Sequence, residues 1–255
     1  MSRKTIAVWF SCGAASAVAA QKTVELYGDT HRIRVLNNPV AEEDSDNIRF
    51  LRDVENWIGV EIESVINSNY PSCSAVEVWA KRKYMSGVAG APCTLELKKR
   101  ARQEWERSNT AHYHVLGFTS EEKHRHDRFI RSEPINVMPV LIDLGLTKRD
   151  CFDVVRSAGI DLPTIYKMGY PNANCIGCVK STSVTYWNHV REVHPDVFQK
   201  RAVQSREIGA KLVRYKGERI YLDELDPKAR GGNMKNLNFE CGLFCDDARE
   251  LEVAK

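Results

Sequence analysis

The sequence predicts an α/β fold: an open, mostly parallel, twisted sheet with helices on both faces, plus a cysteine-bearing C-terminal extension of helices and loops. Three observations support this fold. The apolar run of residues 6–10 leads directly into a loop of small residues and then into a helical stretch. Strand-like and helix-like segments alternate from there to residue 162. Beyond Leu162-Pro163 the pattern changes to turns and cysteines. Alternation of this kind indicates βαβ units joined by right-handed crossovers.

Each expected element follows from its hydrophobic pattern. The expected strands are short apolar or alternating runs, at residues 6–10, 32–36, 60–66, 114–118 and 136–141. The expected helices have apolar residues at helical spacing, at residues 17–27, 44–58, 75–85 and 94–105. In the extension we expect helices up to Gly209 and then a pair of short strands, at residues 211–215 and 219–222.

The composition suits a folded protein of one or two domains. The chain has 255 residues, of which 43% are hydrophobic and 28% charged, and this argues against disorder. We expect a nucleotide-binding domain over residues 1–162 and a cysteine-rich part over residues 163–255. The net charge of +3 is too small to indicate a nucleic-acid binder by itself, although it permits a basic pocket for a phosphate.

The sequence predicts a cytoplasmic protein with no membrane partner. The apolar run after the basic N-terminus stops at Ser11, which is too short for a signal-peptide core or a membrane span. Thiols stay reduced in the cytoplasm. Eight cysteines in such a chain therefore indicate a metal, a cluster or catalysis before disulfides.

The loop after the first expected strand is the first candidate site. It reads Ser11-Cys12-Gly13-Ala14-Ala15-Ser16 and opens a helix. Small residues let the backbone approach a ligand, and a helix N-terminus offers N–H groups and a partial positive charge to a phosphate. From the pattern alone, an ordinary strand-to-helix turn is an equal alternative.

Further motifs follow this loop along the chain. They are Cys93-Thr94-Leu95-Glu96-Leu97-Lys98, Gly117 with Glu122 and Arg125, Tyr166-x-x-Gly169 with Cys175-x-x-Cys178, and Glu240-Cys241-Gly242-Leu243. The loop resembles the S-x-G-x-x-S of the PP-loop superfamily of adenine-nucleotide hydrolase-like proteins. The ordered set, over residues 6–245, resembles its phosphoadenosine phosphosulfate (PAPS) reductase-like branch.

The resemblance implies that an adenine nucleotide, ATP or an adenylyl sulfate, binds at the C-terminal edge of the parallel sheet. The residues that it assigns to nucleotide binding are Ser11, Cys12, Gly13, Ala14, Ser16, Lys98, Gly117 and Arg125.

The cysteines are the second candidate site. Cys175 and Cys178 place two thiols on one tight loop, and Cys241 and Cys245 form a second pair. Four soft ligands suit Zn²⁺ or a [4Fe–4S] cluster, and spacing does not separate the two. The resemblance favours [4Fe–4S], with Cys93, Cys175, Cys178 and Cys245 as ligands and Cys241 as the reactive nucleophile. In the competing assignment Cys241 is a ligand, and Cys93 or Cys245 is not.

The leading hypothesis is a PAPS reductase-like oxidoreductase, in which Cys241 attacks the sulfonate sulfur of an adenylyl sulfate. A thioredoxin-like electron donor is then the expected partner. The alternative within sulfur metabolism is a PP-loop sulfurtransferase that uses ATP to thiolate a nucleic-acid base. The third is a non-catalytic zinc-binding module, favoured by Ala14 and Ala15, where the family commonly has Lys and Asp. The sequence leaves a homodimer open.

Some remaining polar residues and thiols are expected to be structural. His124 and His126 are two residues apart, which places them on different sides of a helix, and we expect a solvated charged helix there. Cys73 and Cys151 are expected to be packed thiols.

Overall fold

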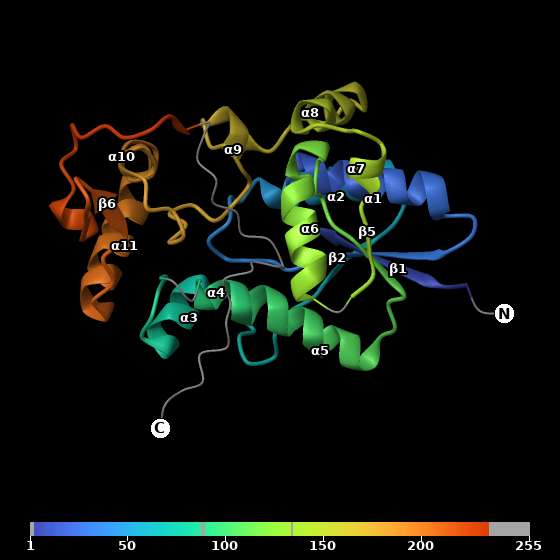
Figure 1. The fold of residues 1–255 in the computed structure, drawn as a ribbon, viewed down its shortest axis with the longest axis horizontal. Coiled ribbons are helices and arrows are strands. Elements are labelled where there is room, and N and C mark those ends of the chain that lie inside the picture. The colour runs from blue at the N-terminus through green and yellow to red at the C-terminus, as the bar shows by residue number, and fades with distance from the viewer. Residues whose placement is uncertain (1–2, 88–89, 134, 235–255) are drawn as a thin grey trace. The chain divides into compact units, whose positions relative to one another are not determined.

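The computed structural model describes residues 3–87, 90–133 and 135–234, and strands and helices alternate in its first half (Figure 1). The elements up to residue 108 are β1 (Thr5–Phe10), α1 (Ala14–Tyr27), β2 (Arg32–Asn37), α2 (Asn47–Ile58), β3 (Ile62–Ser64), α3 (Ala75–Arg82), α4 (Pro92–Thr94), the π-helical η1 (Leu95–Arg100) and α5 (Ala101–Ser108). Those that follow are β4 (Tyr113–Val115), the 3₁₀ turn η2 (Ser120–Glu122), α6 (Lys123–Ser132), β5 (Val137–Met138), α7 (Val140–Asp143), α8 (Lys148–Ser157), α9 (Thr164–Lys167), α10 (Val184–Val193), α11 (Pro195–Ile208), β6 (Val213–Tyr215), β7 (Glu218–Ile220) and the 3₁₀ turn η3 (Leu222–Glu224).

The five-stranded sheet has the order β3-β2-β1-β4-β5, and every neighbouring pair is parallel. This confirms the α/β fold with a parallel sheet. β1 is buried along its whole length, as its apolar run predicts. The chain runs from β1 to β2 and β3 on one side, and β4 and β5 lie on the other. The sheet therefore has a topological switch point at the carboxyl ends of β1 and β4, where open α/β sheets bind their ligands.

Alternate residues of β1 pack against helices on opposite faces of the sheet. Phe10 packs on Phe50 of α2, with ring centroids 6.1 Å apart. Trp9 points the other way and packs edge-to-face on Trp105 of α5, with centroids 5.9 Å apart. Because successive side chains of a strand point to opposite faces, these two contacts cover both sides of the central strand.

The chain forms two compact units. The first holds the five-stranded sheet and consists of residues 1–39, 45–66 and 101–164. The second consists of residues 40–44, 67–100 and 165–255. The expected division was a single step after Leu162. The last segment of the second unit starts at residue 165, close to that position. The unit also includes two segments from within the first 162 residues.

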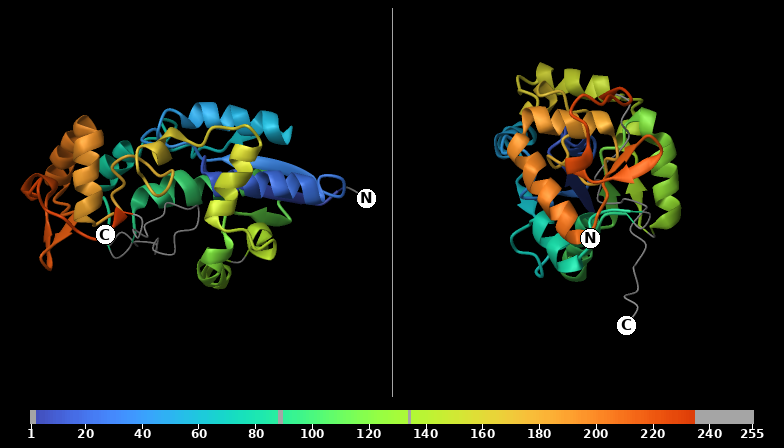
Figure 2. Two further views of the ribbon diagram at one scale, coloured as in Figure 1. Left: turned by 90° about the horizontal axis from the view of Figure 1, so that it is seen from above. Right: turned by 90° about the vertical axis from the view of Figure 1, so that its left-hand side faces the viewer.

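The second unit has a hydrophobic core of its own. Trp79 of α3 and Trp187 of α10 are among its fully buried side chains. α10 is capped by Ser183, whose hydroxyl accepts from the Tyr186 amide, and α11 ends at Gly209 in the left-handed conformation. β6 and β7 form the expected antiparallel pair, and Figure 2 shows it from two further sides together with α10 and α11.

Some elements differ from the expected ones. The strand expected at residues 136–141 is only β5, because Pro139 ends it and α7 begins at Val140. The helix expected at residues 94–105 starts at Pro92 and contains the π-helical segment at the Cys93-to-Lys98 motif. His126 is only 8% exposed and is not on a solvated face. In the described part of the chain, no helix combines the length and apolar character needed to span a membrane.

Candidate functional site

The loop between β1 and α1 is folded by its own two serines. The Ser16 hydroxyl donates to the Gly13 carbonyl oxygen at 2.9 Å and accepts from the Ser11 amide at 3.1 Å. The Ser11 hydroxyl lies 3.2 Å from the Ser16 hydroxyl oxygen. Gly13 is the N-cap and carries no side chain that could cap the helix. The first-turn amides of Ala14 and Ala15 are therefore not covered by a capping side chain, as a phosphate site requires.

Cys12 has a backbone conformation that is unusual for a residue with a side chain. Its φ is 55°, in the left-handed region, and the residue is 3% exposed. Such a residue costs about 1–2 kcal/mol relative to the right-handed conformation. Asn37, the last residue of β2, holds the turn: its side-chain amide donates to the Phe10 carbonyl oxygen at 2.8 Å and lies 3.7 Å from the Cys12 sulfur. The Asn37 side chain thus ties the loop to the neighbouring strand β2, at the switch point of the sheet.

Gly117 brings the end of β4 against the first turn of α1. A β-carbon on Gly117 would lie 2.8 Å from the Ser16 amide nitrogen and 3.1 Å from the Ala15 carbonyl carbon. Real β-carbons essentially never approach backbone atoms that closely, so only glycine fits without a shift. Gly117 and the Ser11-to-Ser16 loop thus meet at the switch point. The structure brings together the sequence-predicted Ser11, Cys12, Gly13, Ala14, Ser16 and Gly117.

The basic residues expected at the nucleotide already have acidic neighbours. Arg125 of α6 forms an ion pair with Glu122 and lies over the Phe118 ring, with its guanidinium 5.5 Å from the centroid. Lys98 belongs to the second unit, where it is 5% exposed and its ammonium lies 3.5 Å from Glu43. Both residues therefore need a change of pairing before they can hold a phosphate.

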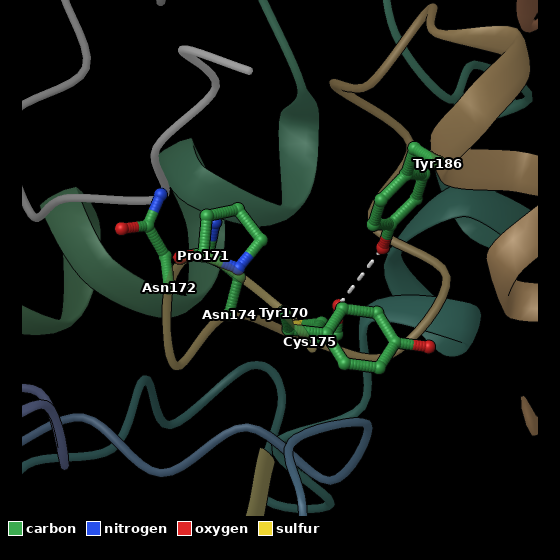
Figure 3. A pocket seen from close by; sticks show the side chains of 6 residues that line it. All are labelled: Tyr170, Pro171, Asn172, Asn174, Cys175 and Tyr186. Carbon is green, nitrogen blue, oxygen red and sulfur yellow. Dashed lines mark hydrogen bonds between the residues drawn. The ribbon is translucent and has the colours of Figure 1, made fainter. Parts of the chain in front are cut away.

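The Cys175–Cys178 loop is held by Tyr186 of α10. The tyrosine hydroxyl accepts from the Cys178 amide at 2.7 Å and lies 3.5 Å from the Cys175 carbonyl oxygen (Figure 3). Burial raises the pKa of Tyr186, so its hydroxyl stays protonated and can donate to that oxygen. A small hollow adjoins the loop, lined by Tyr170, Pro171, Asn172, Asn174, Cys175 and Tyr186.

Three of the expected metal ligands lie in one apolar core. Cys175 and Cys178 are 7% and 5% exposed, and Cys93 packs against the same core. Thiolates in apolar surroundings suit Zn²⁺ or an iron–sulfur cluster. Over the described residues, no three His, Cys, Asp or Glu side chains are grouped so that they could hold a metal. The described residues therefore place Cys175 and Cys178 on one loop and Cys93 at the same core, but they do not group these three thiols as a metal site.

The C-terminal cysteines cannot be placed. Cys241 and Cys245 lie outside the described residues, and with them the expected nucleophile and the fourth ligand. Cys151 and Cys73, both expected to be packed thiols, differ in burial. Cys151 is fully buried, and burial raises its pKa to about 12, which confirms a packed thiol. Cys73 is only partly buried and has a φ of 54°.

Sequence reasoning missed two residues of these sites. Asn37 reads as an ordinary end to a strand, because nothing in a sequence shows that its amide reaches the neighbouring loop. Arg201 lies in a helix rich in charged residues and reads as a surface residue, yet it is 3% exposed. Its guanidinium packs on the Trp79 ring, 4.3 Å from the centroid.

Among known proteins, the similarity of this chain is to solved structures. No protein-family model matches the chain, and no curated protein matches it. Among solved structures, the chain is similar to the U34-tRNA thiolase NcsA from Methanococcus maripaludis with its [4Fe-4S] cluster. The identity is 10% and the TM-score 0.41, over 81% of this chain and 70% of that one. At this level of similarity the functional argument rests on the residues of this chain alone.

Proposed function

We propose that this chain is a PP-loop enzyme that binds an adenine nucleotide between β1 and α1 and carries out sulfur chemistry with a thiolate-held centre. The observation that carries the proposal is the approach of Gly117 to the Ser16 amide at the switch point of the sheet. An ordinary strand-to-helix turn needs neither that approach nor the left-handed Cys12. Both become understandable if the backbone must remain open to a ligand.

The loop residues would bind the phosphates through the backbone. The amides of Ala14 and Ala15 and the positive end of the α1 dipole face the position where an anion binds, and the exposed Ser11 hydroxyl can add a donor. Neutral donors then do what Lys does in other members of the family. Arg125 would supply charge from α6 once a phosphate competes with Glu122 for its guanidinium.

The second unit would hold the sulfur centre. Cys93, Cys175 and Cys178 are the proposed ligands within the described chain, where they share one core but are not grouped as a three-ligand site, and Cys245 or Cys241 would complete the set. When bound, a [4Fe–4S] cluster or Zn²⁺ would supply a Lewis-acidic or redox-active site for sulfur. The residues of this chain would exclude water from it, since the apolar core surrounds the thiols, and Tyr186 would fix the loop.

Two reactions share these parts. In adenylyl sulfate reduction, the Cys241 thiolate would attack the sulfonate sulfur, the nucleotide phosphate would leave, and a thioredoxin-like donor would supply two electrons to release sulfite. In thiolation, ATP would adenylate an oxygen of a nucleic-acid base with release of pyrophosphate, and a sulfide-level sulfur donor would then displace AMP. The described residues would suit either reaction. We therefore propose the enzyme class that both reactions share, and the substrate that the protein converts distinguishes them.

The test combines metal analysis with nucleotide binding. Anaerobically purified protein is analysed for iron and zinc, and calorimetry measures the binding of ATP, adenylyl sulfate and its 3′-phosphorylated form. We expect at least one nucleotide to bind the wild type, and Gly117→Ala to lose that binding. Gly232→Ala is the matched control, because a β-carbon there meets nothing within 4 Å.

The products distinguish the reactions. Sulfite release that Cys241→Ala abolishes, with iron content intact, identifies a reductase. Pyrophosphate release that depends on added transfer RNA identifies a thiolase. Absence of nucleotide binding together with stoichiometric zinc would overturn the proposal in favour of a non-catalytic zinc module.

A further inference from the structure

The hairpin formed by β6 and β7 carries a cluster of exposed cations. Its register places Arg214 directly opposite Arg219, and Val213 opposite Ile220. Val213 and Ile220 pack against the core of the second unit. Because successive side chains of a strand point to opposite faces, the two arginines point away from that core. The hairpin cluster, as we call it, consists of four exposed residues: Lys211, Arg214, Lys216 and Arg219.

The arrangement of these charges works against the stability of the hairpin. Like charges directly opposite each other destabilise a strand pair, and Arg214 and Arg219 are so placed. Lys216 stands in the two-residue turn with a φ of 50°, a conformation that favours Asn or Gly. Any charge on an edge strand protects it from unwanted pairing. A Lys–Glu pair would protect this edge and also stabilise it, so protection alone does not explain two opposed arginines.

The chain does not neutralise the hairpin cluster. Over the described residues, none of its four cations forms an ion pair with a carboxylate. Glu218, the acid within the hairpin, lies opposite Tyr215. The nearest printed neighbours of the two lysines are aromatic: Lys211 lies 5.6 Å from the Tyr221 ring centroid and Lys216 5.1 Å from that of Tyr215. A ring contact leaves the positive charge available to an anion outside the chain.

A partner with closely spaced negative charges fits this surface. Arginine binds a phosphate through two parallel hydrogen bonds, and a phosphodiester backbone carries one charge per nucleotide. An anionic membrane surface would be bound best if apolar side chains lay beside the charges, but Val213 and Ile220 face the core. The observations therefore favour a nucleic acid over a lipid surface.

The state of the nucleic acid follows from the chemistry. An enzyme that modifies a base must reach it outside the stack, either in a single strand or by flipping it out of a duplex. RNA offers unpaired bases in its loops, bulges and ends. A surface that holds the backbone of an unpaired RNA stretch thus needs no duplex to be opened.

We propose that the hairpin cluster binds the phosphate backbone of single-stranded RNA. The proposal deepens the thiolation form of the proposed function and rests on it, because the choice of RNA follows from an acceptor base that must be unpaired. Arg214 and Arg219 hold neighbouring phosphates, and Lys211 and Lys216 add charge beside them. Backbone contacts carry no sequence information, so the hairpin holds the RNA and leaves the choice of base to other residues.

The test compares four full-length proteins. They are the wild type, the double variant Arg214→Gln with Arg219→Gln, the charge-conserving Arg214→Lys with Arg219→Lys, and a control, Lys81→Gln with Lys200→Gln. The control removes the same charge from the same unit, but its lysines are paired with Glu77 and Asp196. Fluorescence anisotropy measures binding of a labelled single-stranded RNA oligonucleotide at several salt concentrations. Duplex DNA, polyglutamate and phosphatidylserine vesicles are the competing probes, and calorimetry measures ATP binding.

We expect the salt dependence to identify the contacts. For single strands, the logarithm of the association constant falls with the logarithm of the salt concentration by about 0.7 per phosphate neutralised. The double Gln variant should therefore bind RNA more weakly, with a slope smaller by about 1.4. The Lys variant and the control should keep the wild-type slope.

Thermal unfolding checks that the double Gln variant is folded. It should melt close to the wild type, because removing the like-charge repulsion offsets loss of the Arg219 hydrogen bond to the Leu212 carbonyl oxygen. If it melts lower, Arg214→Gln alone keeps that bond and replaces it, with an expected change in slope of about 0.7.

Two kinds of result would overturn the inference. One is an unchanged slope in the folded Gln variant. The other is tighter binding of duplex DNA, polyglutamate or vesicles than of RNA. If ATP binds and RNA does not, the inference about the hairpin fails and the proposed function stands. If RNA binds through the hairpin and no adenine nucleotide binds, the proposed enzyme fails and the RNA-binding surface stands.

Discussion

Gly117 lies so close to Ser16 that a β-carbon on the glycine would fall 2.8 Å from the serine amide nitrogen. Two segments that are a hundred residues apart in sequence thus meet where β4 ends and α1 begins. The contact fixes the height of the helix N-terminus above the sheet edge. Any ligand that needs the α1 amides therefore also needs a glycine at this position.

Gly117→Ala should destabilise the first unit and weaken nucleotide binding. The added methyl meets backbone atoms, which cannot rotate away, and overpacking of this kind costs about 1–3 kcal/mol. Urea unfolding measures the stability and calorimetry the binding. Gly232→Ala should stay within about 0.5 kcal/mol of wild type. Wild-type stability in Gly117→Ala would show that β4 and α1 are not held at this distance.

Cys12 allows the strain in the loop to be measured. Cys12→Gly and Cys12→Ala both remove the sulfur, and they differ by one buried methyl group and by backbone freedom at a φ of 55°. We expect the glycine variant to be the more stable of the two by about 1 kcal/mol, because alanine is strained in the left-handed region. Denaturant unfolding of the pair gives this difference directly. A more stable alanine variant would mean that the loop relaxes to an ordinary turn.

Two buried tyrosines of the second unit should respond oppositely to loss of the hydroxyl. The Tyr186 hydroxyl accepts from the buried Cys178 amide, so Tyr186→Phe leaves that amide unsatisfied, at a cost of about 1–3 kcal/mol. The Tyr170 hydroxyl is buried and has no hydrogen-bond partner within the described chain, so Tyr170→Phe should be neutral or stabilising.

Thermal unfolding and metal retention report on this pair of variants. Tyr186→Phe should melt lower and lose metal faster, because its loop carries Cys175 and Cys178. Tyr170→Phe should melt at or above the wild-type temperature and retain metal as the wild type does. Equal losses in the two variants would show that the Tyr186 hydroxyl does not hold the loop.

The sequence predicted those parts of the fold that local pattern determines. The buried run of β1, the small-residue loop and the Cys175-x-x-Cys178 turn are all visible in short windows, because periodicity and turn chemistry are local. The same local patterns do not show which core residues 67–100 join. Their helical pattern is correct, but which core they join depends on contacts with residues beyond 164.

Some residues were misjudged from the sequence for the same physical reason, because their contacts are made far along the chain. His126 has charged neighbours in sequence, yet it is buried against the Phe118 ring, with ring centroids 6.0 Å apart. Asn37 and Arg201 act through contacts with loops at positions 10–12 and 177, and no spacing rule connects such distant positions. Polar residues that enter a core to serve a site are the cases in which local pattern fails.

His114 in β4 is a further buried polar group, and it makes the first unit sensitive to acid. Its Nδ1 accepts from the Trp9 indole N–H at 3.1 Å, and Nε2 lies 3.6 Å from the Glu106 carboxylate. Burial, and then the charge of Arg102, lower the pKa of His114 to about 4. Protonation would place two donors face to face at Nδ1, so the folded state holds the neutral ring.

The stability of the wild type should rise with pH between about 4 and 6.5, where the unfolded chain binds the proton and the folded chain does not. This difference in proton binding contributes about 3 kcal/mol to the free energy of unfolding. The contribution is fully present above pH 6.5 and is lost as the pH falls to 4. Burial raises the pKa of Glu106 above its ordinary value of 4.5. Above pH 4.5 this carboxyl therefore lowers the stability as the pH rises, which reduces the net slope.

His114→Gln separates the two contributions, because it removes the histidine and leaves Glu106, Arg102 and Glu133 in place. Urea unfolding at several pH values between 4 and 7 should show a steeper rise in the wild type than in the variant. A surface histidine, His124→Gln, is the control and should leave the wild-type slope unchanged. Parallel curves for the wild type and His114→Gln would show that the ring accepts a proton in the folded protein, and that the Trp9 contact does not exclude it.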